Sequence, residues 1–222
     1  MGAAAQEENK DPFEAVNRKI FAFNEALDGY FLRPVAKGYR FVTPDPMERG
    51  VSNFVFNILE FNTVINSALQ GRAQDTVHST GRLLINSTLG LGGLFDVATR
   101  IGLEPRTADF GQTLYTWGLG EGPFLMVPVL GPRTMRSGVG TVFDTYTSLP
   151  FLSGEGELSF GFTGVETIDI RAQLLKADEL LSGDRYIFLR ESYRQSREYF
   201  VTGGEIDDSF SDFEDEEDYE EF

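Results

Sequence analysis

Near its start the chain holds a helical segment that is apolar on more than one side. The peptide DPFE at positions 11–14 has the composition of a helix start, with an Asp cap, a Pro in the first turn and a Glu three positions after the cap. Apolar side chains then recur every three or four positions: Phe13, Val16, Ile20, Phe23, Leu27 and Tyr30. Phe21 and Phe31 lie off this stripe, and Pro34 is expected to end the helix. The segment is therefore either buried on two sides or in contact with a membrane.

A second segment, 52–71, has the same property. One predicted helical face carries Val51, Phe54, Val55, Ile58, Ile65 and Leu69. Phe56 and Phe61 lie off that face, and Gly71 is placed as a C-cap glycine. The longest stretch without a charged residue, 83–95, has 13 residues, whereas a transmembrane helix needs roughly 20 apolar ones. Any contact with a bilayer must therefore come from helices that lie flat, or from an apolar surface assembled from several elements.

Two glycine-rich apolar loops follow. Residues 86–103 (NSTLGLGGLFDVATRIGL) lack the Lys-Ser/Thr pair of a phosphate-binding P-loop, and Phe95 stands where a dinucleotide fingerprint needs its third glycine. An apolar helix–turn–helix hairpin, in which the glycines allow a sharp turn or close packing, fits better; Asp75 is expected to cap the helix before it. In the second loop, 117–134, three prolines exclude a helix, and 124–130 is predicted to be a short edge strand or an extended crossing.

The remaining segments are predicted to be ordinary helices. One begins near Thr134, where Gly138 and Gly140 suggest close packing. A second carries the stripe Val165, Ile168, Ala172 and Leu175. Asp184 is expected to cap a third, which is decorated by Arg185, Arg190, Arg194 and Arg197. These arginines form either a solvated basic face or a patch for lipid phosphates or an acidic segment.

The composition excludes several kinds of chemistry. There is no cysteine, so disulfides and thiolate nucleophiles are absent, and the single histidine, His78, is interpreted as a helix-surface residue. No Gly-x-Ser-x-Gly elbow is present. Asp96, Asp109 and Asp144 lie beside apolar stretches and are the candidates for a carboxylate pair, which the sequence alone does not bring together. We therefore predict no catalytic site, no metal site and no cofactor.

Negative charge is concentrated at the C-terminal end. Of 35 acidic residues, 11 lie in 205–222, which has no basic residue. This segment is predicted to be a disordered acidic tail, the alternative being a tail that binds a basic partner or cations. The rest of the chain has 24 acids, 19 bases and no basic stripe, so nucleic acid is not an expected partner. Residues 1–10 are interpreted as a cloning scar or linker, which leaves 11–204 as one domain.

Seven short motifs occur in the order in which one family has them. They are DPFEAVNRKIFAFN (11–24), LRPVAKGYR (32–40), GVSNF (50–54), INSALQG (65–71), LLINSTLGLGGLFDVA (83–98), DFGQTLYTWGLGEGPFLMVPVLGP (109–132) and IDIRAQLL (168–175). Each is weak alone, but together they resemble the MlaA (VacJ) family of outer-membrane lipoproteins over positions 11 to about 204. Members of that family normally begin with a signal peptide and a lipid-modified cysteine, neither of which this sequence contains.

The resemblance implies an all-α fold: a ring-shaped single domain of amphipathic helices that lies in the membrane around a central amphipathic channel. It implies intermembrane phospholipid transport, in which phospholipids mislocalised to the outer leaflet pass through a passive channel to a periplasmic carrier of the Mla pathway. The implied partners are phospholipid, a trimeric porin, that carrier and the bacterial outer membrane, on its periplasmic side. The alternatives are a porin-associated structural lipoprotein without its own conduit, and a lipid hydrolase.

Two sets of residues are then expected to meet lipid. The glycine-rich hairpin is assigned as an apolar wall or gate of the channel, through Leu89, Leu91, Gly92, Gly93, Leu94 and Phe95. Residues off the helical stripes and in the proline-rich loop are assigned as membrane-facing: Phe21, Phe31, Phe56, Phe61, Phe124, Leu125 and Val127.

Overall fold

The computed structural model describes residues 11–175 and 184–204, so the predicted linker and the predicted acidic tail lie outside the described residues. The elements are α1 (Glu14–Leu27), the π-helical turn η1 (Asp28–Leu32), α2 (Arg33–Val42), α3 (Asp45–Leu69), α4 (Ala73–Thr88), α5 (Val97–Arg100), α6 (Phe110–Thr116), β1 (Phe124–Val127), β2 (Gly131–Thr134), α7 (Met135–Thr147), α8 (Leu149–Leu152), α9 (Gly156–Gln173) and α10 (Arg185–Thr202). The fold is helical, as predicted; the antiparallel β1–β2 hairpin is the one sheet in the described ranges.

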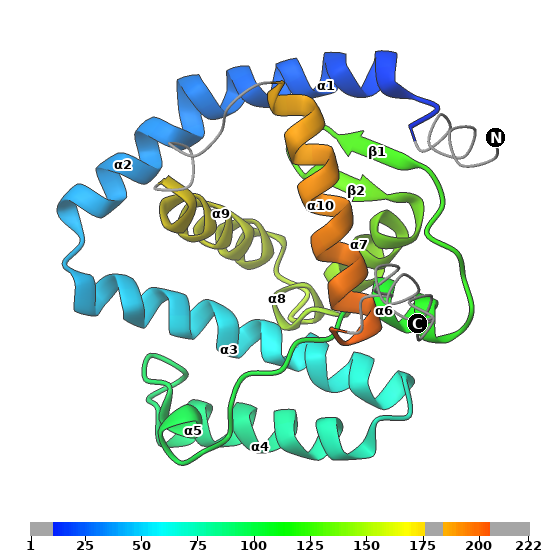
Figure 1. Ribbon diagram of the computed structural model, residues 1–222. Helices are drawn as coiled ribbons and strands as arrows, with labels where there is room; N and C mark the ends of the chain where they lie inside the picture. Colours follow the sequence, from blue (N-terminus) through cyan, green and yellow to red (C-terminus); the bar gives the residue numbers. More distant parts are fainter. Residues whose placement is uncertain (1–10, 176–183, 205–222) are drawn as a thin grey trace, which may run out of the picture.

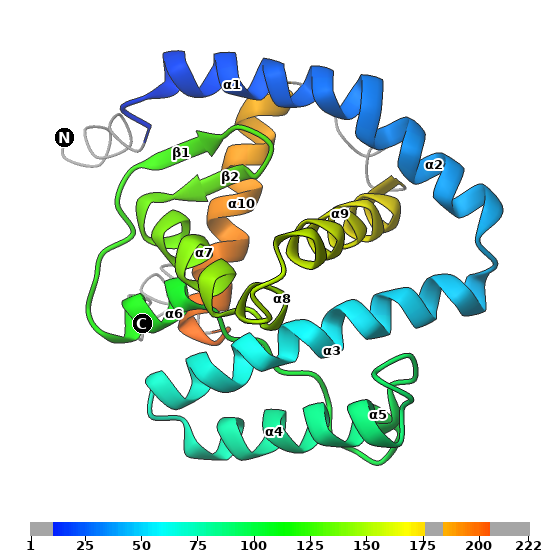
Figure 2. The ribbon, with the colours of Figure 1, turned by 180° about the vertical axis from the view of Figure 1, so that it is seen from behind.

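The helices are arranged as a ring (Figure 1). α1, η1 and α2 form one continuous arc, and α3 returns along the opposite side. The β-hairpin, α6, α7 and α10 close the ring, as the view from behind also shows (Figure 2). α9 lies inside the ring and packs against α2 and α3, while α4 packs along the side of α3 that points away from the centre.

Polar side chains fill much of the space between the helices. Apart from Val55, the residues that α3 buries are polar or charged: Asn57, Glu60, Asn62, Thr63, Asn66 and Ser67. Phe54, Phe56 and Leu69 of the same helix are exposed. A helix of a water-soluble protein has the opposite arrangement, with its apolar stripe facing the core. The distribution on α3 is thus inverted, which is the arrangement expected where the surroundings are apolar.

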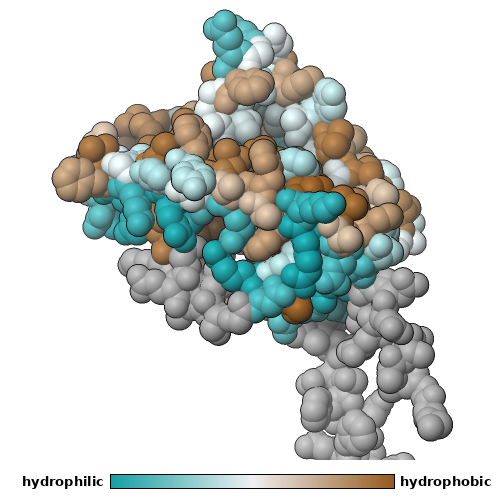
Figure 3. Space-filling view, turned by 90° about the horizontal axis from the view of Figure 1, so that it is seen from above, coloured by the Kyte–Doolittle hydropathy of each residue, from teal (hydrophilic) through white to brown (hydrophobic). Residues whose placement is uncertain are grey.

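Exposed apolar side chains form a band on the surface, and hydrophilic residues gather to one side of it (Figure 3). The arc of α1, η1 and α2 contributes Val16, Phe23, Tyr30, Phe31 and Phe41 to the exposed apolar residues. Among the described helices, none is long and apolar enough to cross a membrane. A contiguous apolar surface of this kind marks a site of contact with lipid or protein.

A small apolar core joins the hairpin to α1 and α10. Its fully buried members are Phe124, Met126 and Tyr186, and Phe21 packs against them. The ring of Tyr186 meets those of Phe21 and Phe124 edge to face, with centroids 5.7 and 6.3 Å away. Burial raises the pKa of Tyr186, and its hydroxyl donates a hydrogen bond to Asp11.

Several predicted helix ends are confirmed. Gly71 follows α3 with a φ of +72°, the left-handed conformation of a C-cap glycine. The hydroxyl of Thr134 accepts from the backbone of Ser137 at the start of α7, and the carboxylate of Asp184 accepts from the backbone of Tyr186 and Ile187 at the start of α10. The predicted edge strand is β1.

Three other predictions about helix ends are wrong. Pro34 does not end a helix, because it lies in the first turn of α2, and the wider π-helical turn before it accommodates the ring and the missing N–H. Asp11 does not cap α1, because its carboxylate binds the amide of Asn17 at 2.8 Å and the Tyr186 hydroxyl instead. Asp75 lies inside the first turn of α4 and forms ion pairs with Arg72 and Arg106.

Candidate functional site: a central cavity

A cavity of about 340 Å³ lies inside the ring, between α1, η1, the β-hairpin, the end of α9 and the start of α10. Apolar side chains supply part of its lining: Phe21, Leu32, Met126, Val129, Leu174 and Leu189. Polar and charged side chains supply the rest: Asn24, Glu25, Asp28, Arg171 and Arg185. The cavity is thus amphipathic, and it draws on segments far apart in the sequence.

Two ion pairs connect α1 and η1 to the helices on the far side of this cavity. The guanidinium of Arg171 on α9 donates from Nε and Nη2 to the two carboxylate oxygens of Asp28, at 2.5 and 2.9 Å. Arg185 on α10 forms the same kind of bidentate pair with the two carboxylate oxygens of Glu25, at 3.0 and 3.1 Å. Such fork-shaped pairs fix geometry as well as charge. They place fixed charges of both signs beside the apolar lining.

Two asparagines of α1 hold the hairpin in place. The amide of Asn17 donates to the carbonyl of Phe124 at 3.1 Å, and its oxygen accepts from the N–H of Met126 at 2.9 Å. Asn24 makes the same pair of bonds to the carbonyl of Val127 and the N–H of Val129, at 2.9 and 2.8 Å. These side chains satisfy the free edge of β1 as a neighbouring strand would. The sequence gives little sign of this role, because an asparagine on a polar helix face usually faces water.

The predicted membrane-facing residues differ widely in exposure. Phe31 and Phe56 are exposed, while Phe61, Leu125 and Val127 are half-buried. For Phe124 the prediction is wrong, because this side chain is 1% exposed and lies in the core. Phe21 packs on that same core and lines the central cavity. The strand explains the error: β1 alternates between buried and half-buried residues, so its apolar run does not face one side.

The residues predicted to form a gate lie in the loop between α4 and α5, and none of them lines the central cavity. Leu89, Leu91, Leu94 and Phe95 are exposed. The backbone beneath them is tightly held: Gly93 has a φ of +95°, and a Cβ built on it would lie 2.6 Å from the Cβ of Asn57. The loop is an apolar hairpin, as predicted; its role as a gate stays a prediction, and its position beside α3 does not support it.

The side chain of Asn86 shapes this same loop from below. Its oxygen accepts from the N–H groups of Val97 and Ala98, both at 2.9 Å, and its amide donates to Asp96 at 3.1 Å. Asp96 in turn caps the short α5. The phosphate-binding interpretation is thereby further weakened, because the N–H groups of Val97 and Ala98 at the start of α5 are already bonded within the protein.

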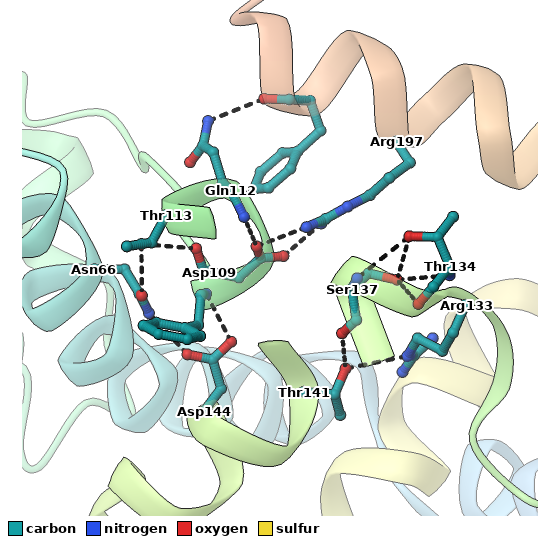
Figure 4. Close-up of polar contacts among 12 residues, drawn as sticks. Asn66, Asp109, Gln112, Thr113, Arg133, Thr134, Ser137, Thr141, Asp144 and Arg197 are labelled. Atoms are coloured by element: carbon teal, nitrogen blue, oxygen red, sulfur yellow. Dashed lines mark hydrogen bonds and ion pairs between the residues drawn. The ribbon is translucent and has the colours of Figure 1, made fainter. Parts of the chain in front are cut away.

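A partly buried polar cluster joins α3, α6, α7 and α10 (Figure 4). Asp109 caps α6 through the N–H of Gln112 at 2.7 Å and binds the guanidinium of Arg197 with both oxygens, one contact being 2.7 Å. Asp144 accepts from the amide of Asn66 at 2.8 Å and from the N–H of Phe110 at 3.0 Å. Two of the three candidate carboxylates are therefore neighbours, whereas Asp96 lies in the loop after α4.

This cluster is built for structure rather than chemistry. Burial raises the pKa of Asp144 to about 6, and the nearby charge of Asp109 acts in the same direction. Each carboxylate is engaged by donors from the helices that it joins, and neither lines any of the cavities described here. In the described part of the chain no group of His, Asp and Glu side chains is arranged to hold a metal ion.

Comparison with known proteins gives consistent matches over most of the chain. The protein-family model described as MlaA lipoprotein matches residues 9–200. An Escherichia coli K12 protein named intermembrane phospholipid transport system lipoprotein MlaA is 39% identical over 209 residues, which cover 90% of this chain and 82% of that protein. The Haemophilus influenzae protein of the same name is 32% identical, covering 91% and 83%. A solved structure from work on the structural basis for maintenance of bacterial outer membrane lipid asymmetry matches with a TM-score of 0.77 and 38% identity, over 87% of this chain and all of that one.

Proposed function

Because this chain belongs to the MlaA lipoprotein family and so functions in intermembrane phospholipid transport, we propose that it carries phospholipids through its central cavity. Its place is the system that maintains outer-membrane lipid asymmetry. The amphipathic lining of the central cavity is the observation that carries the proposal. A phospholipid has a charged head group and apolar chains, and this cavity offers fixed charges and apolar side chains next to each other.

Such a cavity lowers the free-energy cost of moving the charged head group across the membrane. Moving a charged group through hydrocarbon costs at least ~3 kcal/mol. The pairs Asp28–Arg171 and Glu25–Arg185 replace part of the lost hydration. Leu174, Leu189 and Phe21 leave a surface along which acyl chains can follow. No nucleotide-binding motif is present, so net movement requires a downstream acceptor that binds lipid more tightly.

The surroundings of the ring follow from its exposed apolar band. Helices that lie flat, with apolar side chains outward and polar ones inward, suit a protein embedded in one membrane. We place the exposed loop residues Leu89, Leu91, Leu94 and Phe95 in contact with lipid, as part of this band. A trimeric porin beside the ring and a periplasmic carrier below it complete the proposal, in which the protein conducts lipid and catalyses no reaction.

A bulky side chain in the cavity tests the conduit. Leu174 is half exposed and lines the cavity at the end of α9, so Leu174→Trp narrows the passage without disturbing a buried contact. We expect cells that carry only this variant to accumulate phospholipid in the outer leaflet, measured as the lipid that an added phospholipase cleaves. Ile170→Trp, one turn earlier on α9 and outside the cavity lining, is the matched control and should behave as wild type.

The same strains separate the alternatives. Full activity of Leu174→Trp at normal protein levels would refute passage through this cavity and favour a structural lipoprotein without its own conduit. Lipid that copurifies with the wild-type protein and is depleted in Leu174→Trp would support transport. Release of free fatty acid from phospholipid by the purified protein would instead identify a hydrolase.

A further inference from the structure

A second cavity, of about 370 Å³, lies where the last turns of α10 meet the loop that follows α6 (Figure 1). It shares no residue with the central cavity. Its side-chain lining includes Tyr115, Glu121, Arg136, Glu198 and Thr202. Its volume falls within the range of small-molecule sites, about 300–1,000 Å³.

Arg136, at the start of α7, is the unusual group in this lining. The residue is 6% exposed and forms no ion pair with a carboxylate of the described residues. Its Nη1 donates to the carbonyl of Leu119 at 3.0 Å, and its Nε has no partner within the described ranges. Glu121, an acid in the lining, acts to raise the pKa of Arg136, but its carboxylate contacts Arg194 at 3.5 Å.

A buried charge without a directly contacting counter-ion is costly, so this guanidinium favours an anion in contact with it. Burial accordingly lowers the pKa of Arg136. The ring of Tyr115 lies 5.1 Å from the guanidinium carbon and offers only partial compensation through its π face. The nearby carboxylates of Glu121 and Asp109 act to raise this pKa without touching the guanidinium, and an anion that enters the cavity would add the direct ion pair that is missing among the described residues.

The loop after α6 leaves one wall of the cavity bare. A Cβ built on Gly120 would meet no other atom within 4 Å, and the φ of this glycine lies outside the left-handed region. Neither close packing nor backbone conformation therefore requires glycine at this position. Without a side chain at position 120, the space next to Arg136 stays open.

We propose that this second cavity binds a phosphate group through Arg136, either the head-group phosphate of a phospholipid or a free phosphate. The planar guanidinium presents its N–H donors in the geometry that phosphate oxygens accept. Leu119, which lines the cavity and is about half exposed, suits a ligand that also has apolar parts. The site is separate from the lipid conduit, and the proposal does not rest on transport.

Calorimetric titration of the full chain in nonionic detergent tests the site with two probes, dihexanoylphosphatidylglycerol and inorganic phosphate. Arg136→Gln should weaken binding at least about tenfold, because a charge-assisted pair is lost. Gly120→Val should weaken it by a similar factor by filling the open wall. Glu198→Gln removes a carboxylate from the lining and should tighten binding about threefold. Arg133→Gln, which removes a cation outside this cavity, should leave binding unchanged.

The two probes distinguish the sources of the phosphate. Binding of the lipid alone identifies a phospholipid head group, and equal binding of both identifies a site for free phosphate. If Arg136→Gln does not fold, Gly120→Val and Glu198→Gln still test the site through their opposite effects. Absence of binding by the wild-type protein, or binding that none of the three variants changes, would overturn the proposal.

Discussion

At the scale of single residues, buried polar side chains hold the elements together. Asn17 and Asn24 bond the edge of β1, Asn66 joins α3 to Asp144 of α7, and Asn86 organises the loop before α5. In the sequence these residues look like the solvent-facing side of amphipathic helices. These bonds join positions 11 to 107 residues apart, so local patterns do not reveal them. Local patterns likewise did not identify the lining of the central cavity, and none of the hairpin residues assigned to a channel gate lies there.

The raised pKa of Asp144 predicts that the stability of the protein depends on pH. Its pKa of about 6 in the folded protein lies above the unfolded value of 3.8, so between these pH values the folded state binds more protons than the unfolded state. The free energy of unfolding should therefore fall as pH rises from 4 to 6, by as much as about 3 kcal/mol at ~1.4 kcal/mol for each pKa unit. Asp144→Asn should remove this slope, measured by denaturant unfolding in nonionic detergent.

The control for this experiment is Asp45→Asn. Asp45 is exposed in the first turn of α3 and lies outside the cluster, so its replacement should leave the slope between pH 4 and 6 intact. A slope that persists unchanged in Asp144→Asn would show that another group titrates in this range.

At the scale of elements, local signals predicted the helices well where their ends are determined by local bonds. Thr134, Asp184 and Gly71 all act at helix ends as their residue types suggest. The failures at Asp11 and Pro34 have tertiary causes: Asp11 is recruited by α10, and a π-helical turn carries the chain past Pro34. The sequence-based rules describe an isolated helix, whereas the structure at these two positions is determined by contacts with other parts of the fold.

The packing of α6 against α7 gives a test at this scale. A Cβ built on Gly140 would lie 2.4 Å from the backbone nitrogen of Gly111 and 2.8 Å from its Cα, so the helices can approach only without side chains. Gly140→Ala should therefore lower the free energy of unfolding by about 1–3 kcal/mol, the usual effect of overpacking. Denaturant unfolding measures it.

Gly138, on the same helix, is the matched control. Close packing was predicted for both glycines and is confirmed for Gly140 alone, because a Cβ on Gly138 would meet nothing within 4 Å. Gly138→Ala should be neutral or stabilise the helix by up to about 1 kcal/mol. Equal destabilisation by both variants would mean that the contact with Gly111 does not govern the effect.

At the scale of the whole molecule, the decisive feature is the surface. Phenylalanines off the helical stripes indicated helices with two apolar faces, and Phe31 and Phe56 are indeed exposed. The closure of the ring was not readable from periodicity and entered only through the family resemblance. Which apolar residues face inward depends on how the hairpin and α10 meet, as Phe124 shows.

The exposed arc of α1, η1 and α2 should account for part of the affinity for membranes. Phe31 and Phe41 are 58% and 91% exposed, and a phenylalanine transferred from water contributes about 1.5–3 kcal/mol. The double variant Phe31→Ser, Phe41→Ser should bind zwitterionic vesicles at least about tenfold more weakly in a flotation assay. Lys19→Ser, Lys37→Ser on the same arc is the control, since neutral vesicles do not attract these charges. Unchanged flotation of the phenylalanine variant would place the membrane contact elsewhere.

The inverted distribution of side chains on α3 also bears on how such a sequence can drift during evolution. In a water-soluble fold, large apolar positions are restrained because they must fit a close-packed interior, while polar positions vary freely. Here Phe54, Phe56 and Leu69 face outward and need only remain apolar, so their shapes can change from one descendant to the next. Small polar residues such as Asn62 and Asn66 touch their partners directly and leave selection almost no choice. Along this helix, the small polar residues should therefore be the slowest to change.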